Sequence, residues 1–238
     1  MIIREKKILI EDIEITFFAS NRSKSIRISI DPIKGVRVSV PLFVSFNSAK
    51  SFTLSKISWI KKHISKIEKL KMTIFQPGLE LNTNFSIIQF KFSSTEKIKS
   101  IQRNHLVEIL IPDHFDVKYS NNQLIIREEI EKILRKEAKK YLPNRVEYFA
   151  KKHQFNYNKV RVKNSKTRWG SCSAINNINL NLHLMRLPNE LIDYVVLHEL
   201  AHTKIKNHQK EFWDLLDNIS GDAKGLDKEL KKYHIHIY

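Results

Sequence analysis

A histidine-rich motif near the C-terminal end constrains this chain more than any other feature. The sequence His-Glu-Leu-Ala-His begins at His198 and ends at His202, and a third histidine, His208, follows after five residues. On a helix, side chains four residues apart project from one face, so His198 and His202 can reach a single metal ion while Glu199 lies beside them. The polar residues that precede His208 can bend the chain and bring a third nitrogen to the same ion. The spacing therefore predicts a three-histidine metal site with an open coordination position.

The residues before the motif are expected to form its helix. Apolar residues recur at helical spacing from Ile192 through Val195 and Val196 to Leu200. A mostly apolar helix that carries two histidines and a carboxylate would be costly if these polar groups had no partner. This context favours a metal site over a solvated helix with incidental histidines.

The charge of the chain indicates an affinity for polyanions. The sequence has 42 Lys and Arg residues against 25 Asp and Glu residues, which gives a formal net charge of +17. Such a charge attracts nucleic acid, nucleotide phosphates and acidic proteins at long range. The lysines are spread over the whole chain, however, so a solvated basic surface explains the charge equally well.

Cysteine content and hydropathy bear on the compartment. Cys172 is the only cysteine, so no internal disulfide can form and a reducing environment is expected. No apolar run has the length needed to cross a bilayer, and residues 1–7 carry no signal-peptide pattern. We therefore expect a cytoplasmic protein that does not bind membranes.

The pattern along the chain predicts an α+β fold in two parts. Residues 1–127 form a β-rich region with one helix at residues 45–71, and residues 128–238 form a helix-rich domain that contains the metal motif. A hairpin connection is predicted at residues 31–35, and a long helix from Glu128 to about His153, which a proline at position 143 can break or kink. The remaining predicted strands lie at residues 14–18, 25–30, 36–40, 85–92, 107–111, 124–126 and from 160 onward.

A segment that precedes the motif is unusual because tryptophan, glycine and cysteine cluster there. It runs from Lys166 to Ser173, and a cleanly alternating segment follows at residues 178–184. The alternation predicts a hairpin and a strand beside the metal helix, with Asn179, Asn181 and His183 facing outward. Such an edge strand can bind an extended substrate through backbone hydrogen bonds, although a turn that merely supports the site explains the pattern equally well. The candidate substrate-binding residues are Arg168, Trp169, Asn179 and Asn181.

With these residues in view, the chain resembles the YgjP-like metallopeptidase family, formerly a domain of unknown function. The resemblance rests on residues 166–173, on the alternating segment with Leu187-Pro188, on residues 193–202, and on Asn207-His208 with Phe212-Trp213. It implies a zincin-like metallopeptidase domain in which His198, His202 and His208 bind the metal and Glu199 is the general base. The chain is also similar, more distantly, to SprT-type proteases that act on DNA-bound proteins.

The predicted function is that of a zinc-dependent hydrolase, although another divalent transition metal can fit the site. In the favoured hypothesis the chain is a metallopeptidase that acts on peptides or proteins through a metal-activated water, with Glu199 as the base. A nucleoside triphosphate pyrophosphohydrolase is the alternative, with Arg168 neutralising phosphate charge. A third hypothesis is a nucleic-acid-binding protein with a structural metal, which Cys172 would complete as a fourth ligand.

Overall fold

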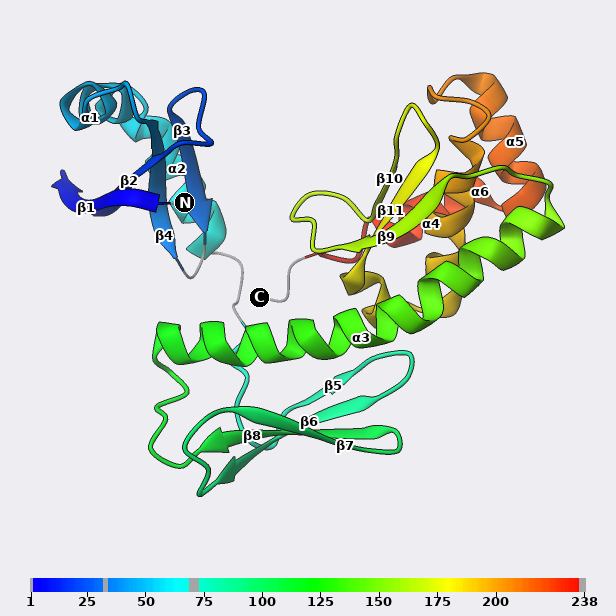
Figure 1. Cartoon of the computed structure of the whole chain (residues 1–238), viewed down its shortest axis with the longest axis horizontal. Helices are drawn as coiled ribbons and strands as arrows, with labels where there is room; N and C mark the ends of the chain where they lie inside the picture. The colour runs from blue at the N-terminus through cyan, green and yellow to red at the C-terminus, as the bar shows by residue number, and fades with distance from the viewer. Residues whose placement is uncertain (1, 32–33, 69–72, 236–238) are drawn as a thin grey trace. The chain divides into compact units, whose positions relative to one another are not determined.

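The computed structural model describes residues 2–31, 34–68 and 73–235 and divides into two compact units (Figure 1). Among the described residues, the first unit comprises those up to residue 73 and the second comprises residues 74–235. The boundary that composition indicates at residue 128 thus falls inside the second unit. The physical reason is that residue 128 lies inside a long helix, residues 120–152, which shares one apolar core with the sheet before it.

The first unit is a four-stranded sheet with two helices. The strands are β1 (Ile2–Ile10), β2 (Ile13–Ser20), β3 (Arg27–Asp31) and β4 (Gly35–Pro41), in the order β1-β2-β4-β3. The central pair, β2 and β4, is parallel, and the outer pairs are antiparallel. The predicted hairpin between β3 and β4 is confirmed, although residues 32–33 of its connection lie outside the described residues.

Helices α1 (Phe46–Leu54) and α2 (Ile57–Glu68) follow β4, where the sequence predicts a single helix. Ser45 caps α1, since its side chain accepts a hydrogen bond from the backbone N–H of Ser48. The first helix ends at Leu54 with Ser55 as its C-cap, and α2 begins at Ile57. Ala49 of α1 and Ile60 of α2 join the apolar core of the sheet, so both helices belong to the same small unit.

The second unit begins with a sheet of the same design. Its strands are β5 (Glu80–Asn82), β6 (Ile87–Ser93), β7 (Lys99–Arg103) and β8 (Leu106–Pro112), in the order β5-β6-β8-β7. As in the first unit, the central pair is parallel and the outer pairs are antiparallel. The two units therefore have the same strand topology. The sequence itself shows no internal repeat that would indicate this.

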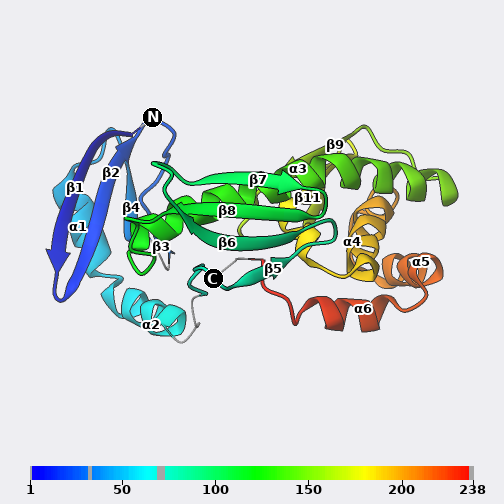
Figure 2. The ribbon, with the colours of Figure 1, turned by 90° about the horizontal axis from the view of Figure 1, so that it is seen from below.

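Helix α3 (Ser120–Lys152) connects this sheet to the rest of the unit. The strands of the sheet run along its first part, and its second part reaches the elements that carry the histidine motif (Figures 1 and 2). The prediction of a strand at residues 124–126 is wrong, because Ile126 continues the apolar stripe formed by Ile130, Ile133 and Leu134. Pro143 lies within the helix and does not end it.

The remaining elements form a small sheet and three helices. The strands are β9 (Lys159–Lys163), β10 (Gly170–Cys172) and β11 (Asn177–Asn181), in the order β10-β11-β9. A 3-10 helix, η1 (Leu182–Arg186), leads into α4 (Asn189–Ala201), which is followed by α5 (Lys210–Ser220) and α6 (Ala223–Leu230). The predicted hairpin is confirmed as the antiparallel pair β10-β11.

The strand predicted at residues 178–184 is shorter than expected and is not an edge. It ends at Asn181 because η1 begins there, and it lies between β10 and β9, so β10 is the edge strand beside it. Asn181 and His183 are buried and do not face outward. The strand is short and His183 is buried because the alternating pattern continues into a 3-10 turn packed in the core, whereas the strand is internal because β9 pairs with its second side.

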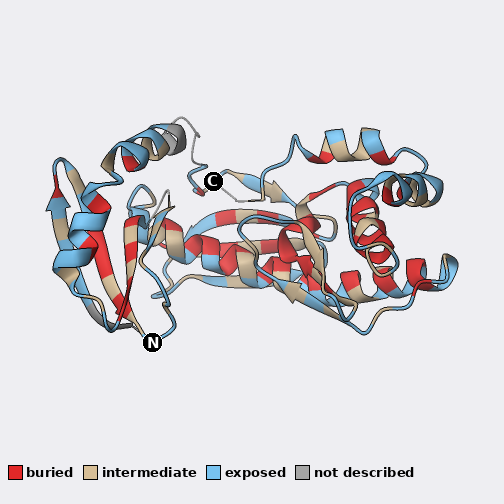
Figure 3. Ribbon diagram, turned by 90° about the horizontal axis from the view of Figure 1, so that it is seen from above, coloured by how far each residue is buried: buried red, intermediate tan, exposed pale blue. Residues whose placement is uncertain are grey.

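The second unit has one continuous apolar core. It extends from the sheet through α3 and α4 to α6, and Figure 3 shows buried residues along α3 and α4. The α+β fold class is therefore confirmed. None of the helices in residues 2–31, 34–68 and 73–235 is both long enough and apolar enough to cross a bilayer.

Candidate metal centre

Helix α4 positions the first part of the histidine motif. The side chains that anchor it, including Ile192, Val195 and Val196, are buried in the core of the second unit. His198 and Glu199 lie in its last turn, and His202 caps its C-terminal end. The motif therefore occupies the end of a helix whose position is fixed by packing.

The three imidazoles of the motif converge. The Nε2 atom of His198 lies 3.2 Å from that of His202 and 3.1 Å from that of His208, and the Nε2 atoms of His202 and His208 are 3.1 Å apart. Among the described residues, these three form the one group of histidine, cysteine and acidic side chains whose ligand atoms approach closely enough to hold a metal ion.

This arrangement fits a tetrahedral metal ion. With Zn–N distances of about 2.0–2.1 Å, the nitrogens of a tetrahedral site lie about 3.3–3.4 Å apart, close to the separations in this triangle. The protonation of His202 is also suited to a ligand. Its Nδ1 atom lies 3.0 Å from the carbonyl oxygen of Ile205, which can only accept, so Nδ1 carries the proton and Nε2 of the neutral ring keeps its lone pair.

Burial favours the neutral, ligand-competent form of the two helical histidines. Burial, together with the neighbouring His202 and His208, lowers the pKa of His198 to about 4. Burial also lowers the pKa of His202, and the nearby Lys206 contributes to this shift. At neutral pH both rings are therefore available to bind a cation.

Phe212 of α5 fixes the three rings. Its side chain is fully buried, and its ring centroid lies 4.5 Å from that of His202, 4.8 Å from that of His208 and 5.0 Å from that of His198. The ring planes of His202 and Phe212 are stacked. His208 itself is exposed and lies in the loop before α5, so this contact ties the third histidine to the core.

Glu199 lies in an almost closed environment. Its side chain is 5% exposed, and its Oε2 atom has no hydrogen-bond partner among the described residues. Burial raises the pKa of Glu199 to about 8, and the positive charge of Arg168 opposes this shift. The carboxyl can therefore hold or release a proton near neutral pH.

Gly170 allows β10 to approach this carboxyl. A Cβ atom at position 170 would lie 2.5 Å from Oε1 of Glu199, closer than any real Cβ contact. The sequence shows Gly170 as one of only five glycines, but it does not show what the glycine touches. The absence of a side chain here is what lets the edge strand lie directly against Glu199.

Cys172 lies near this site without joining the three nitrogens. Its Sγ atom is not a member of the metal-ligand group, and it accepts a hydrogen bond from Nζ of Lys206, 3.7 Å away. Burial raises the pKa of the Cys172 thiol, which disfavours the thiolate that binds metals. Lys206 also donates to the backbone oxygen of Ser173 and to Oδ1 of Asn176. It therefore connects the loop between α4 and α5 to the β10-β11 turn.

The four candidate substrate-binding residues line one cavity. Arg168, Trp169, Asn179 and Asn181 surround a volume of about 270 Å³, and Gly170 forms part of the same wall. Arg168 is exposed, and Nδ2 of Asn179 donates to Oγ of Ser171. Nδ2 of Asn181 donates to the backbone oxygens of Ser165 and Arg168, so this buried amide shapes the loop that bounds the cavity.

Comparison with known proteins identifies the family. The model of the YgjP-like metallopeptidase domain matches residues 24–233. A comparison with curated proteins gave no match. Among solved structures, the metallopeptidase zymogens jannalysin of Methanocaldococcus jannaschii and abylysin of Pyrococcus abyssi are each 25% identical to this chain, with TM-scores of 0.34. Each alignment covers 37% of this chain, with 92% of jannalysin and 91% of abylysin. Because the family model spans most of its length, the chain belongs to the YgjP-like metallopeptidase family and is a metal-dependent hydrolase.

Proposed function

We propose that this protein is a zinc-dependent peptidase of the zincin type, in which His198, His202 and His208 hold the metal and Glu199 is the general base. The observation that carries the proposal is the mutual approach of three Nε2 atoms to 3.1–3.2 Å at the end of α4. Three nitrogen ligands leave one position of a tetrahedral ion open, which is the arrangement of catalytic zinc sites.

When bound, the zinc ion would act as a Lewis acid that lowers the pKa of a water molecule to about 7 and polarises the scissile carbonyl group. Glu199 would accept a proton from the attacking water at its carboxylate and then donate it to the leaving amine nitrogen. The burial of Glu199 supports this role, because a carboxyl with a raised pKa can return the proton it has taken.

Strand β10 is the proposed docking edge for the substrate backbone. Among the described residues, β10 pairs with β11 on one side and has no second strand partner. An extended peptide can add to such an edge through backbone hydrogen bonds, and Gly170 places this edge against Glu199. Side chains of a bound peptide would alternate between the two faces of the sheet. Ser171 and Asn179 are cross-strand partners, so their side chains share one face of the sheet. Both residues line the cavity of about 270 Å³, which is therefore open to side chains on that face.

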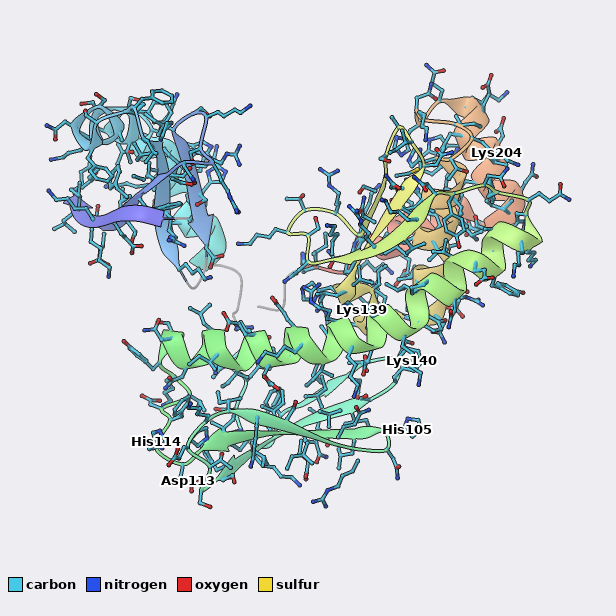
Figure 4. The ribbon with its side chains drawn as sticks, viewed as in Figure 1. His105, Asp113, His114, Lys139, Lys140 and Lys204 are labelled. Atoms are coloured by element: carbon cyan, nitrogen blue, oxygen red, sulfur yellow. The ribbon has the colours of Figure 1, made fainter. Side chains whose placement is uncertain are left out.

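The test compares the wild-type protein with Glu199→Gln and His208→Ala on an unfolded, fluorescently labelled protein. We expect Glu199→Gln to retain its metal and to lose cleavage by roughly a thousandfold or more, because removal of a general base costs about 10²–10⁴ in rate. We expect His208→Ala to lose metal affinity. His105→Ala and His114→Ala are matched controls, since both histidines lie outside the metal-ligand group (Figure 4).

Metal content is measured by atomic emission after dialysis, so that activity is compared at equal occupancy. Cleavage by Glu199→Gln at the wild-type rate would exclude Glu199 as the base. If His208→Ala and His114→Ala had equal metal content, His208 would be excluded as the third metal ligand.

A further inference from the structure

A second cavity lies between α3 and the sheet β5-β6-β8-β7, and the catalytic proposal does not use it. Its volume is about 540 Å³, which is within the range of small-molecule sites. One wall comes from α3, and the other comes from β7, β8 and the residues before β6. None of its lining residues belongs to the metal centre or to the cavity beside β10.

One rim of the cavity is cationic. Lys132, Lys136 and Lys140 follow one another at four-residue spacing on α3, so their side chains lie on one face of the helix, about 6 Å apart along its axis. Nζ of Lys136 donates to Oε1 of the neutral side chain of Gln102, 2.8 Å away, so its charge is not cancelled. Lys132 is paired with Glu129, whereas Lys140 is exposed at the end of the row.

The opposite part of the wall is apolar and aromatic. Phe85 and Val107 line it, Ile133 of α3 adds a further apolar side chain beside the lysines, and Phe85 is 38% exposed. Tyr141 holds the ring of Phe85 in an edge-to-face contact at 5.0 Å between centroids. An ordered, accessible aromatic ring inside a concave site offers a surface for a planar ligand group.

The wall also contains an incompletely bonded carboxyl group. Oε1 of Glu137 accepts hydrogen bonds from Oγ of Ser86 at 2.6 Å and Oγ1 of Thr83 at 3.0 Å. Oε2 of the same side chain is buried without a hydrogen-bond partner among the described residues, and Glu137 as a whole is 8% exposed. Burial raises the pKa of Glu137, so this carboxyl does not cancel the lysine charges fully.

We propose that this cavity binds a small organic phosphate monoester with a planar aromatic body, of the size of a nucleoside monophosphate. The phosphate group carries a charge of about −1.5 to −2 at neutral pH, which matches Lys136 and Lys140 better than a singly charged carboxylate does. The aromatic body packs on the ring of Phe85, which Tyr141 holds in place. The site is separate from the proposed peptidase centre and does not depend on it.

Isothermal titration calorimetry at 0.15 M salt tests the proposal, because charges beyond about 8 Å are screened there. The probes are adenosine monophosphate, adenosine and inorganic phosphate. We expect adenosine monophosphate to bind with a dissociation constant below about 1 mM, and each of the other two at least about tenfold more weakly. If adenosine monophosphate gives no heat of binding, the proposal is overturned. If adenosine or phosphate binds as tightly as adenosine monophosphate, the site does not recognise both the phosphate group and the aromatic body, and the proposal is overturned as well.

Charge reversal tests the location. We expect the double variant Lys136→Glu/Lys140→Glu to bind adenosine monophosphate at least about tenfold more weakly, because hydrogen bonds to charged groups are lost. Lys139→Glu is the matched control, since Lys139 neighbours Lys140 on the same helix but does not line the cavity (Figure 4). Phe85→Ala should weaken binding of adenosine monophosphate without changing that of phosphate. Equal losses in Lys139→Glu and the double variant would show only general attraction to a basic surface and would overturn the site.

Discussion

Addition of one methyl group at position 170 should separate catalysis from metal binding. In Gly170→Ala, the new Cβ atom would lie 2.5 Å from Oε1, 2.7 Å from Cγ and 2.8 Å from Cδ of Glu199. Because three atoms of one side chain are too close, a rotation of the terminal carboxylate alone cannot relieve the contact. To restore an ordinary contact of 3.4 Å, the Glu199 carboxyl and β10 must move apart by about 0.9 Å.

The magnitude follows from this displacement. A catalytic group misplaced by about 1 Å costs roughly a hundredfold in rate, so we expect kcat/KM of Gly170→Ala to fall by about two orders of magnitude. The free energy of unfolding should fall by about 1–3 kcal/mol, as for other overpacked sites. The metal content should not change, because Gly170 is not a ligand and His198, His202 and His208 keep their contacts with Phe212.

The assay measures cleavage of a labelled peptide, metal content and urea unfolding on the same preparations. Ser171→Ala is the control, because Ser171 is the next residue of β10. Its side chain lines the cavity of about 270 Å³ beside this strand. A Gly170→Ala protein with wild-type kcat/KM would refute the reasoning that β10 and Glu199 jointly form the catalytic centre. Loss of the metal in Gly170→Ala would show that the contact supports the metal site rather than the base.

Three further predictions concern other contacts. Cys172→Ala should retain the metal affinity of the wild type within about twofold, measured by competition with a chelator, because the thiol is outside the ligand group; a loss of tenfold or more would make Cys172 a ligand. Glu137→Gln should remove part of the pH dependence of stability. The raised pKa of Glu137 means that its stabilising contribution is complete below the pKa of the unfolded chain and is lost as the pH rises through the folded value. As the pH rises above the ordinary pKa range of glutamate, urea midpoints should therefore fall more steeply in the wild type than in the variant, and parallel curves would contradict this. Asp193→Asn should lower the free energy of unfolding by about 1–3 kcal/mol. The reason is that it weakens the ion pair with Arg145, which has two hydrogen bonds and joins α3 to α4. An unchanged free energy of unfolding would show that this ion pair does not stabilise the fold.

The convergence of the three histidines was predictable from sequence because their spacing is local. The interval from His198 to His202 is one helical turn, and the apolar residues around it indicate the helix that carries it. The position of His208 required only that the chain turn once, which it does before α5.

The parts that the sequence did not predict depend on contacts between distant residues. Gly170 and Glu199 are 29 positions apart, and no local pattern indicates that they touch. The apolar run at residues 124–126 is too short to distinguish a strand from a helix, and packing of α3 against the sheet decides it. Strand β1 escaped prediction because charged residues from Arg4 to Lys7 obscure its alternation.

The order in which these elements leave the ribosome follows from their order along the chain. Both four-stranded sheets and the whole of α3 precede residue 153, whereas the three metal-binding candidates are made after residue 197. At about 5–20 residues per second, roughly 5–20 s pass between the end of β8 and the synthesis of His208. The sheet can thus form while the chain still lacks every nitrogen of the proposed metal centre. If these three histidines bind the metal as proposed, its capture therefore follows the synthesis of both sheets and of α3 and occurs on a scaffold that has already been made.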